Sequence, residues 1–157
     1  MCTKNEITYT YDGNGNQTSR SDGTDKSVFT YDGSGALTRA VVKNGTETDT
    51  ETYAYDWQGN RILKKTGSEE IHYVLDTNNW ISHVIAETDA SGQLTAHYTR
   101  GDDMLISQEQ DGADAYYIYD GHGSVRMLAD ENSEITDRYD YDAYGVLTAK
   151  TGTAVNP

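Results

Sequence analysis

Residues 9–16 read Tyr-Thr-Tyr-Asp-Gly-Asn-Gly-Asn, and this short stretch decides the fold because the chain repeats it. The pattern aromatic-x-Tyr-Asp-x-x-Gly returns at residues 29–35, 53–59, 117–123 and 139–145. The aspartates at positions 12, 32, 56 and 76 are 20, 24 and 20 residues apart, and a looser copy stands at residues 89–92. A period of this length holds two strands and two turns, so the sequence predicts a repeat architecture.

Each copy predicts the end of a strand followed by a hairpin turn. In Tyr-x-Tyr both rings lie on one face of a strand, because side chains alternate between the two faces. In Asp-x-x-Gly the carboxylate accepts a hydrogen bond from the backbone two residues on, and the glycine takes up the left-handed conformation. We therefore expect structural turn residues at Asp12, Gly15, Asp32, Gly35, Asp56, Gly59, Asp120, Gly123, Asp142 and Gly145.

A second class of tight turn is expected between the copies, of type I′, at Asp22-Gly23, Asn44-Gly45 and Asp111-Gly112. Two turn classes in alternation predict an all-β fold, an antiparallel up-and-down meander of hairpins that forms a curved sheet, and no helix is expected. The expected strands are 5–11, 16–21, 25–31, 36–43, 47–55, 60–66, 70–75, 80–88, 93–99, 104–110, 114–119, 124–129, 134–141 and 146–150.

The chain is expected to form one continuous β-structure in three parts. Repeats occupy residues 1–75, an irregular segment follows over residues 76–103, and further repeats occupy residues 104–157. The irregular segment contains the most apolar expected strand, Trp80–Ile85, and we expect the sheet to bend there.

The composition limits the kinds of partner. Thirteen Tyr, fifteen Gly and a net charge of -14 favour an extended, solvent-exposed β-structure, and intrinsic disorder is the competing interpretation. Disordered chains lack aromatic residues, whereas this one repeats them in register. The negative field would repel nucleic acid and anionic lipid. No run of about 18 apolar residues is present for membrane insertion, and Cys2, the single cysteine, excludes an internal disulfide.

The sequence offers no catalytic, cofactor-binding or metal-binding residues. The four histidines are spread over different expected strands and turns, at His72, His83, His97 and His122, and none stands in a nucleophile motif. Residues 12–16 resemble the start of a calcium loop, but Gln17 and Gly23 replace its glycine and its bidentate glutamate. We therefore expect neither an enzyme nor a cofactor.

The repeats resemble the Tyr-Asp (YD) repeats of the Rhs type, and the C-terminal half resembles the Rhs repeat-associated core. The most specific match runs over Tyr117-Ile-Tyr-Asp-Gly-His-Gly-Ser-Val-Arg126, continues with Leu128-Ala-Asp130, and ends with Tyr139-Asp-Tyr-Asp-Ala-Tyr-Gly145. The resemblance covers nearly all of the chain. The family includes bacterial polymorphic toxins, insecticidal toxin-complex components and animal teneurins.

The resemblance implies a structural function, a wall segment of a spiralling β-shell that encloses a C-terminal effector. The implied partners are the remainder of the shell and that effector, and the implied location is secreted or at the bacterial cell surface. In this family the core continues past the position of Asn156-Pro157 into a self-cleavage region, so no self-cleavage residue is expected within this chain.

Two further interpretations remain open at the level of sequence. The chain could bind a carbohydrate at a cell surface by stacking Trp57 or Trp80 on sugar rings, as is suggested for YD repeats. It could also form a homodimer, either through the unpaired edges near Ile7–Tyr11 and Val146–Lys150 or through its aromatic face.

Overall fold

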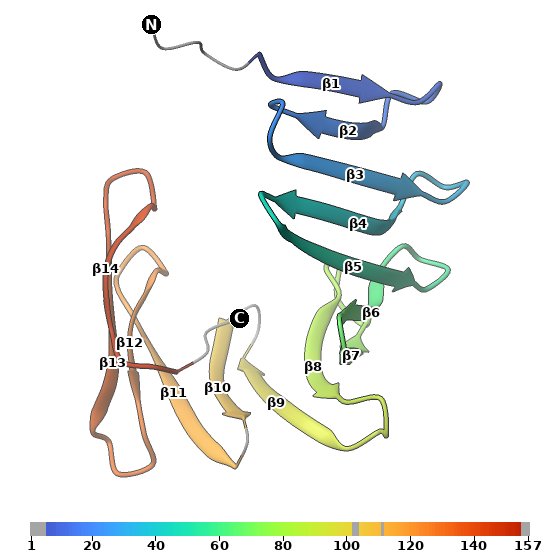
Figure 1. Cartoon of the computed structure of the whole chain (residues 1–157). Coiled ribbons are helices and arrows are strands. Elements are labelled where there is room, and N and C mark those ends of the chain that lie inside the picture. Colours follow the sequence, from blue (N-terminus) through green and yellow to red (C-terminus); the bar gives the residue numbers. More distant parts are fainter. Residues whose placement is uncertain (1–5, 102–103, 111, 155–157) are drawn as a thin grey trace, which may run out of the picture. The chain divides into compact units, whose positions relative to one another are not determined.

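The computed structural model describes residues 6–101, 104–110 and 112–154, and all of the regular structure in those ranges is β-strand (Figure 1). No helix in these ranges is long and apolar enough to cross a membrane. The strands are β1 Thr8–Tyr11, β2 Gln17–Ser21, β3 Lys26–Tyr31, β4 Leu37–Asn44, β5 Glu47–Tyr55, β6 Arg61–Thr66, β7 Glu69–Asp76, β8 His83–Thr88, β9 Leu94–Gly101, β10 Met104–Gln110, β11 Ala113–Tyr119, β12 Val125–Ala129, β13 Ile135–Tyr141 and β14 Leu147–Thr151. The all-β prediction is confirmed.

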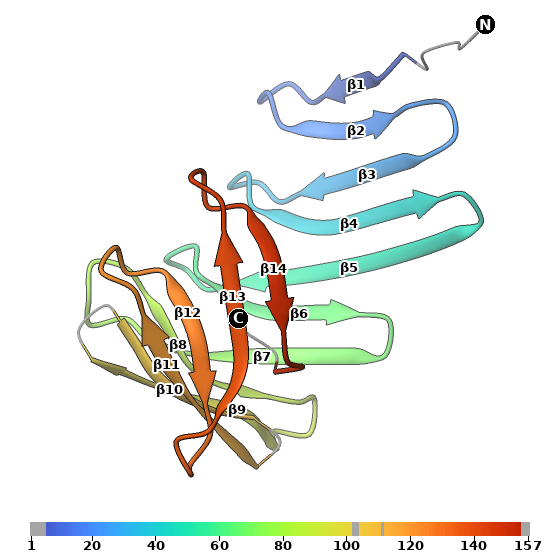
Figure 2. The same cartoon turned by 90° about the vertical axis from the view of Figure 1, so that its left-hand side faces the viewer.

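The strands form an antiparallel meander in the order in which they occur in the chain. In the pair β3 and β4, for example, Val28 lies opposite Val41, and the register shifts by one residue at Tyr31, next to the turn. The same shift occurs at Tyr11, Tyr55, Tyr119 and Tyr141. Each of these Asp-x-x-Gly turns is therefore followed by a β-bulge, whose extra residue lies on the strand after the turn and which strengthens the local twist of the sheet. Figure 2 shows the two turn classes of β1–β7 at opposite edges.

The chain divides into two compact units, which we describe separately. The first unit comprises Met1–Ser82 with Thr88–Gln93, and the second comprises His83–Glu87 with Leu94–Pro157. The division at residues 75 and 103 that we expect from the sequence remains a prediction.

The face of the sheet that carries the repeated tyrosines, here called the tyrosine face, is built differently in the two units. Among the described residues of the first unit, Ala40 is the one buried apolar side chain, and the rings of this face are partly or largely exposed. In the second unit the buried apolar residues of this face are Ala96, Tyr98, Ala115, Tyr117, Leu128 and Tyr139, and Ala115, Tyr117, Leu128 and Tyr139 form one core cluster. The first unit is thus a single layer, while the second covers much of its own tyrosine face.

Two expectations are wrong. The strand predicted from residue 80 begins at His83, because Trp80 and Ile81 are fully or largely exposed in a bend and have no apolar partner surface. The turn at Asn44-Gly45 is not type I′, because β4 and β5 are joined by the two-residue loop Gly45-Thr46, in which only Gly45 has a positive φ. A positive φ at the first central position defines type II′.

The other two turns expected to be of type I′ are those at Asp22-Gly23 and Asp111-Gly112. The loop from Asp22 to Asp25 has four residues, because Ser21 pairs with Lys26, and only Gly23 has a positive φ. The expected turn at Asp111-Gly112 depends on Asp111, which lies outside the described residues, as does Cys2.

Candidate functional site

The repeated structural site is the turn Asp-x-x-Gly, here called the YD turn. In the first copy the N–H of Asp12 donates to the carbonyl of Asn16 at 3.0 Å, and the N–H of Gly15 donates to the carbonyl of Asp12 at 3.2 Å. The carboxylate of Asp12 accepts from the backbone N–H groups of Asn14 and Asn16, both at 2.9 Å. The described residues contain seven such turns, at residues 12–15, 32–35, 56–59, 89–92, 120–123, 130–133 and 142–145.

The carboxylate of the YD turn is held in its charged form by these N–H donors. The pKa of Asp12 lies below its ordinary value of 3.8, first because the side chain of Asn16 donates to it and then because the backbone N–H groups do. The pKa of Asp56 is lowered in the same way by Asn60, and in the turn of Asp120 the backbone N–H groups are the main cause of a lowered pKa. These carboxylates accept hydrogen bonds from the chain's own backbone. Among the described residues no group of three or more His, Cys, Asp or Glu is placed to hold one.

The expected strands 124–129 and 134–141 predict a connection over residues 130–133, but not that this connection is a YD turn. Asp130 begins a turn whose fourth residue is Ser133, with the same hydrogen bonds at 3.0 Å and a positive φ of 66°. Ser133 is the one described residue other than glycine with a positive φ. Because the fourth residue is serine and not glycine, the motif Asp-x-x-Gly does not identify this turn.

A second contact links consecutive repeats through the YD tyrosine, the residue directly before the aspartate. The hydroxyl of Tyr31 donates to the carbonyl of Gln17 at 2.9 Å, and Gln17 is the residue that pairs with Tyr11 across the preceding YD turn. The hydroxyl of Tyr55 donates to the carbonyl of Leu37 at 2.9 Å, and Leu37 pairs with Tyr31. Each of these YD tyrosines therefore fastens its own repeat to the turn of the repeat before it.

In the second unit a YD tyrosine also donates to a carbonyl of the preceding strand, but its acceptor Leu105 pairs with Arg100 and not with a YD tyrosine. The hydroxyl of Tyr119 donates to the carbonyl of Leu105 at 2.6 Å. The ring of Tyr117 stacks on that of Tyr119 with centroids 6.3 Å apart, and its hydroxyl donates to the buried Gln108 at 2.6 Å. Burial is the main cause that raises the pKa of Tyr117 above its ordinary value. At neutral pH this hydroxyl keeps its proton and remains a donor.

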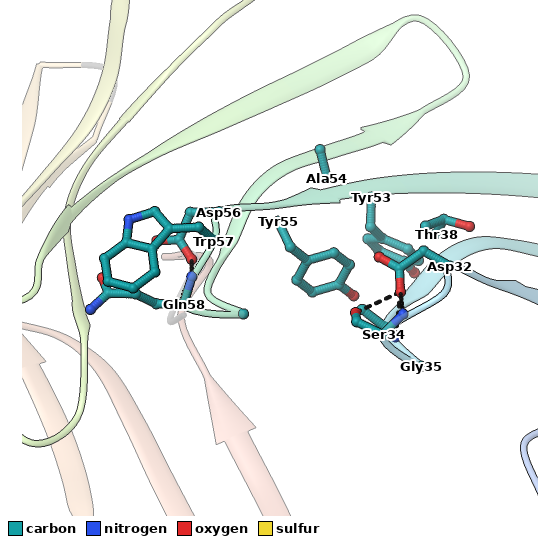
Figure 3. Close-up of a pocket in the computed structure, with 12 residues that line it drawn as sticks. Asp32, Ser34, Gly35, Thr38, Tyr53, Ala54, Tyr55, Asp56, Trp57 and Gln58 are labelled. Atoms are coloured by element: carbon teal, nitrogen blue, oxygen red, sulfur yellow. Dashed lines mark hydrogen bonds between the residues drawn. The ribbon is translucent and has the colours of Figure 1, made fainter. Parts of the chain in front are cut away.

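An open groove of 830 Å³ lies between two consecutive YD turns of the first unit (Figure 3). The turn at residues 32–35 lines one side and the turn at residues 56–59 lines the other, with Tyr53 and Tyr55 of β5 between them. Trp57 is 90% exposed at one end of the groove, beside Gln58. Trp80, the other tryptophan considered for stacking, is exposed but does not line the groove.

The structure does not gather the histidines into a site. His72 lies on β7 beside Glu70, with 2.9 Å between the ring Nε2 and the carboxylate, and His122 lies inside a YD turn. His83 is on β8 and His97 is on β9.

The comparisons with known proteins agree with this architecture. The model of the teneurin YD-shell family matches residues 2–156. The chain is 38% identical over 142 residues to the tRNA3(Ser)-specific nuclease WapA of Bacillus spizizenii and 37% identical over 142 residues to the tRNA nuclease WapA of Bacillus subtilis strain 168. Each match covers 90% of this chain but only 6% of the relative.

A solved structure shares the fold. The Tc holotoxin pore of Photorhabdus luminescens matches with a TM-score of 0.51 and 14% identity, over 93% of this chain and 10% of that chain. The chain belongs to the teneurin YD-shell family.

Proposed function

We propose that the chain is a wall segment of a β-shell that encloses a C-terminal effector, and that it is not itself an enzyme. The observation that carries the proposal is the contact between YD tyrosine and preceding YD turn at Tyr31 and Tyr55, with a related bond from Tyr119 to the preceding strand. A contact that depends only on the neighbouring repeat lets a sheet grow without a fixed limit, because each repeat docks on the one before it.

The thin first unit supports the same proposal. A domain that folds around its own core buries its aromatic face, whereas here Tyr9 and Tyr11 remain 45% and 60% exposed. A single-layer sheet of this kind suits a casing around other residues. The toxin-related relatives favour a secreted or surface-exposed parent protein, with the remainder of the shell and the effector as partners.

Limited proteolysis of the complete polypeptide that contains this chain tests the enclosure. We expect the segment after the shell to survive a protease concentration that degrades the same segment expressed alone. Equal digestion of the two would contradict enclosure.

A second function, carbohydrate binding, is favoured by the groove. Trp57 offers an exposed ring for stacking on a sugar, and Asp32, Ser34 and Gln58 offer hydrogen-bonding groups nearby. Calorimetric titration with glycans identified on an array would show saturable binding that is lost in Trp57→Ala. The matched control is Trp80→Ala, since Trp80 is also exposed but lies outside the groove. Equal loss in both variants, or no binding, would exclude the groove.

We also propose that isolated copies of the chain associate through their edge strands. Tyr11 on β1 is a YD tyrosine with no preceding repeat among the described residues. Leu147 on β14 pairs with Tyr141 just as Gln17 pairs with Tyr11, so its carbonyl is the equivalent acceptor. Because these surfaces differ, the association is head to tail.

A further inference from the structure

One residue of the second unit departs from its repeat at a buried position. On β9 and β11 the residue two places before the buried tyrosine is alanine, at Ala96 before Tyr98 and at Ala115 before Tyr117. On β13 the equivalent residue before Tyr139 is Asp137, and it is only 2% exposed. A buried carboxylate is costly unless it is hydrogen-bonded, so this position requires a partner that the other two do not.

The partner comes from the segment that follows β14. The backbone N–H of Ala154 donates to Oδ1 of Asp137 at 3.0 Å. Among the described residues this is the hydrogen bond that the carboxylate accepts. Ala154 itself packs against the core cluster that contains Tyr117, Leu128 and Tyr139.

The path of the chain explains how Ala154 reaches this position. Arg138 pairs with Thr151, so a longer β14 would place residue 152 opposite Asp137 at the edge of the sheet. The strand ends at Thr151 instead, and Gly152 has a positive φ of 90°. In Figure 2 the chain turns aside from the strand direction at the end of β14. The contacts of Ala154 place the returning segment on the tyrosine face.

Gly152 fits this path for a second, steric reason. A Cβ at this position would overlap the carboxylate of Asp137 and would lie 2.5 Å from the carbonyl oxygen of Thr136. Other glycines with a similar φ, such as Gly123 at 84°, have open space where the Cβ would stand. Gly152 is therefore required by close packing as well as by backbone conformation.

Lys150 holds the other side of the segment. Its Nζ donates to the carbonyl of Ala154 at 3.0 Å and lies 5.6 Å from the centre of the Tyr139 ring, within the range of a cation–π contact. The peptide unit of Ala154 is thus bound at both its N–H and its C=O. Ala154 is therefore held by two polar contacts and one apolar contact.

We propose that Asp137, with Lys150, forms a peptide-binding site that fastens the segment Gly152–Ala154 across the tyrosine face of the second unit. The chain leaving β14 is thereby turned onto this face and does not continue along the edge of the sheet. The inference rests on contacts within the second unit, so it stands or falls independently of whether a shell encloses an effector.

Amide exchange of the 15N-labelled chain, followed by NMR, tests the proposal. In the native chain we expect the Ala154 amide to exchange at least about tenfold more slowly than an unstructured amide, since exchange requires the hydrogen bond to open. In Asp137→Ala this protection should disappear while the amides of β9 and β11 stay protected. This variant carries the residue of the two equivalent positions, so we expect it to fold. An equally protected Ala154 in this variant would overturn the proposal.

A second pair of variants decides the matter if Asp137→Ala does not fold. Gly152→Ala and Gly123→Ala both place a Cβ at a positive φ, but only the first meets the carboxylate of Asp137. We expect Ala154 to lose protection in Gly152→Ala and to keep it in Gly123→Ala. Retained protection in both variants would show that the segment is not held by this site.

Discussion

The hydroxyl of Tyr55 donates a 2.9 Å hydrogen bond to the carbonyl of Leu37, the residue that pairs with Tyr31 across the preceding YD turn. This bond joins two repeats whose main-chain ladders would otherwise be their chief connection. The two residues of the Tyr-Asp motif therefore have different roles. The aspartate closes its own turn, and the tyrosine binds its repeat to the preceding repeat.

Removing this hydroxyl should weaken the junction between the two repeats. For Tyr55→Phe we expect a loss of about 1 kcal/mol in the free energy of unfolding, the usual net value of one hydrogen bond. The control is Tyr144→Phe, because Tyr144 is 93% exposed within a YD turn, and a surface change of this kind costs less than about 0.5 kcal/mol. Urea unfolding followed by far-UV circular dichroism measures the stability of both variants. Equal unfolding midpoints would show that the Tyr55 hydroxyl does not stabilise the junction between the repeats.

Replacing the glycine of a YD turn should lower the stability of the fold because of the backbone conformation alone. Gly59 has a φ of 86° and open space where a Cβ would stand, so Gly59→Val adds strain without a clash at the Cβ. We expect a cost of at least about 1 kcal/mol. Thr48→Val on the exposed part of β5 is the control and should cost less. Thermal unfolding midpoints that coincide for the two variants would show that this turn tolerates a side chain.

The turn aspartates predict a loss of stability in acid. Because the pKa of Asp56 is lower in the folded chain than its ordinary value of 3.8, the charged form stabilises the fold. This contribution is fully present above the ordinary pKa and is lost as the pH falls through the folded pKa. The turn aspartates should therefore change the unfolding midpoint in urea little between about pH 5 and pH 7. Below about pH 4 their protonation should make the midpoint fall steeply.

NMR titration of the Asp56 carboxyl tests this assignment at a single residue. We expect its pKa below 3.8. Asp56→Asn keeps an oxygen that can accept the two backbone N–H groups, so it should retain the turn and show a weaker dependence on acid. An ordinary pKa for Asp56, or an unchanged acid dependence in Asp56→Asn, would argue against the role of the charge.

The edges of the sheet predict self-association of the isolated chain. Light scattering should show an apparent mass that rises with concentration, and Tyr11→Phe should weaken the effect because it removes the proposed donor to Leu147. Tyr144→Phe should not, since Tyr144 is outside both edge strands. A strict monomer at every concentration would exclude association through these edges.

Much of the fold could be predicted because the repeat combines several local signals. The period-two tyrosines and the Asp-x-x-Gly spacing act within a few residues, so they fix turns and strands without knowledge of the tertiary structure. The start of the strand expected at residue 80 was predicted wrongly, because apolar composition alone favoured it, whereas Trp80 and Ile81 are exposed and the strand begins at His83. The connection at residues 130–133 was expected, but its YD geometry was not, because a serine depends on its context to adopt the positive φ of Ser133.

The partners of the buried side chains could not be predicted from the sequence. The acceptors of Tyr31 and Tyr55 are backbone carbonyls, which leave no signature in residue identity. Asp137 also gave no local signal, because its partner is the backbone N–H of Ala154, 17 residues away. Only comparison with the alanines at equivalent positions of β9 and β11 marks it as unusual.

The central claim, that this sheet is the wall of a shell, is tested most directly by the accessibility of neighbouring residues on its two faces. Phe29 and Val28 are adjacent on β3 and point to opposite faces, with Phe29 on the tyrosine face and Val28 on the other. Each is replaced by cysteine in a Cys2→Ser background and treated with a bulky maleimide-polyethylene glycol. In the complete polypeptide the wall predicts modification of Val28→Cys but not of Phe29→Cys, and modification of both in the isolated chain. Equal modification of the two in the complete polypeptide would contradict the account.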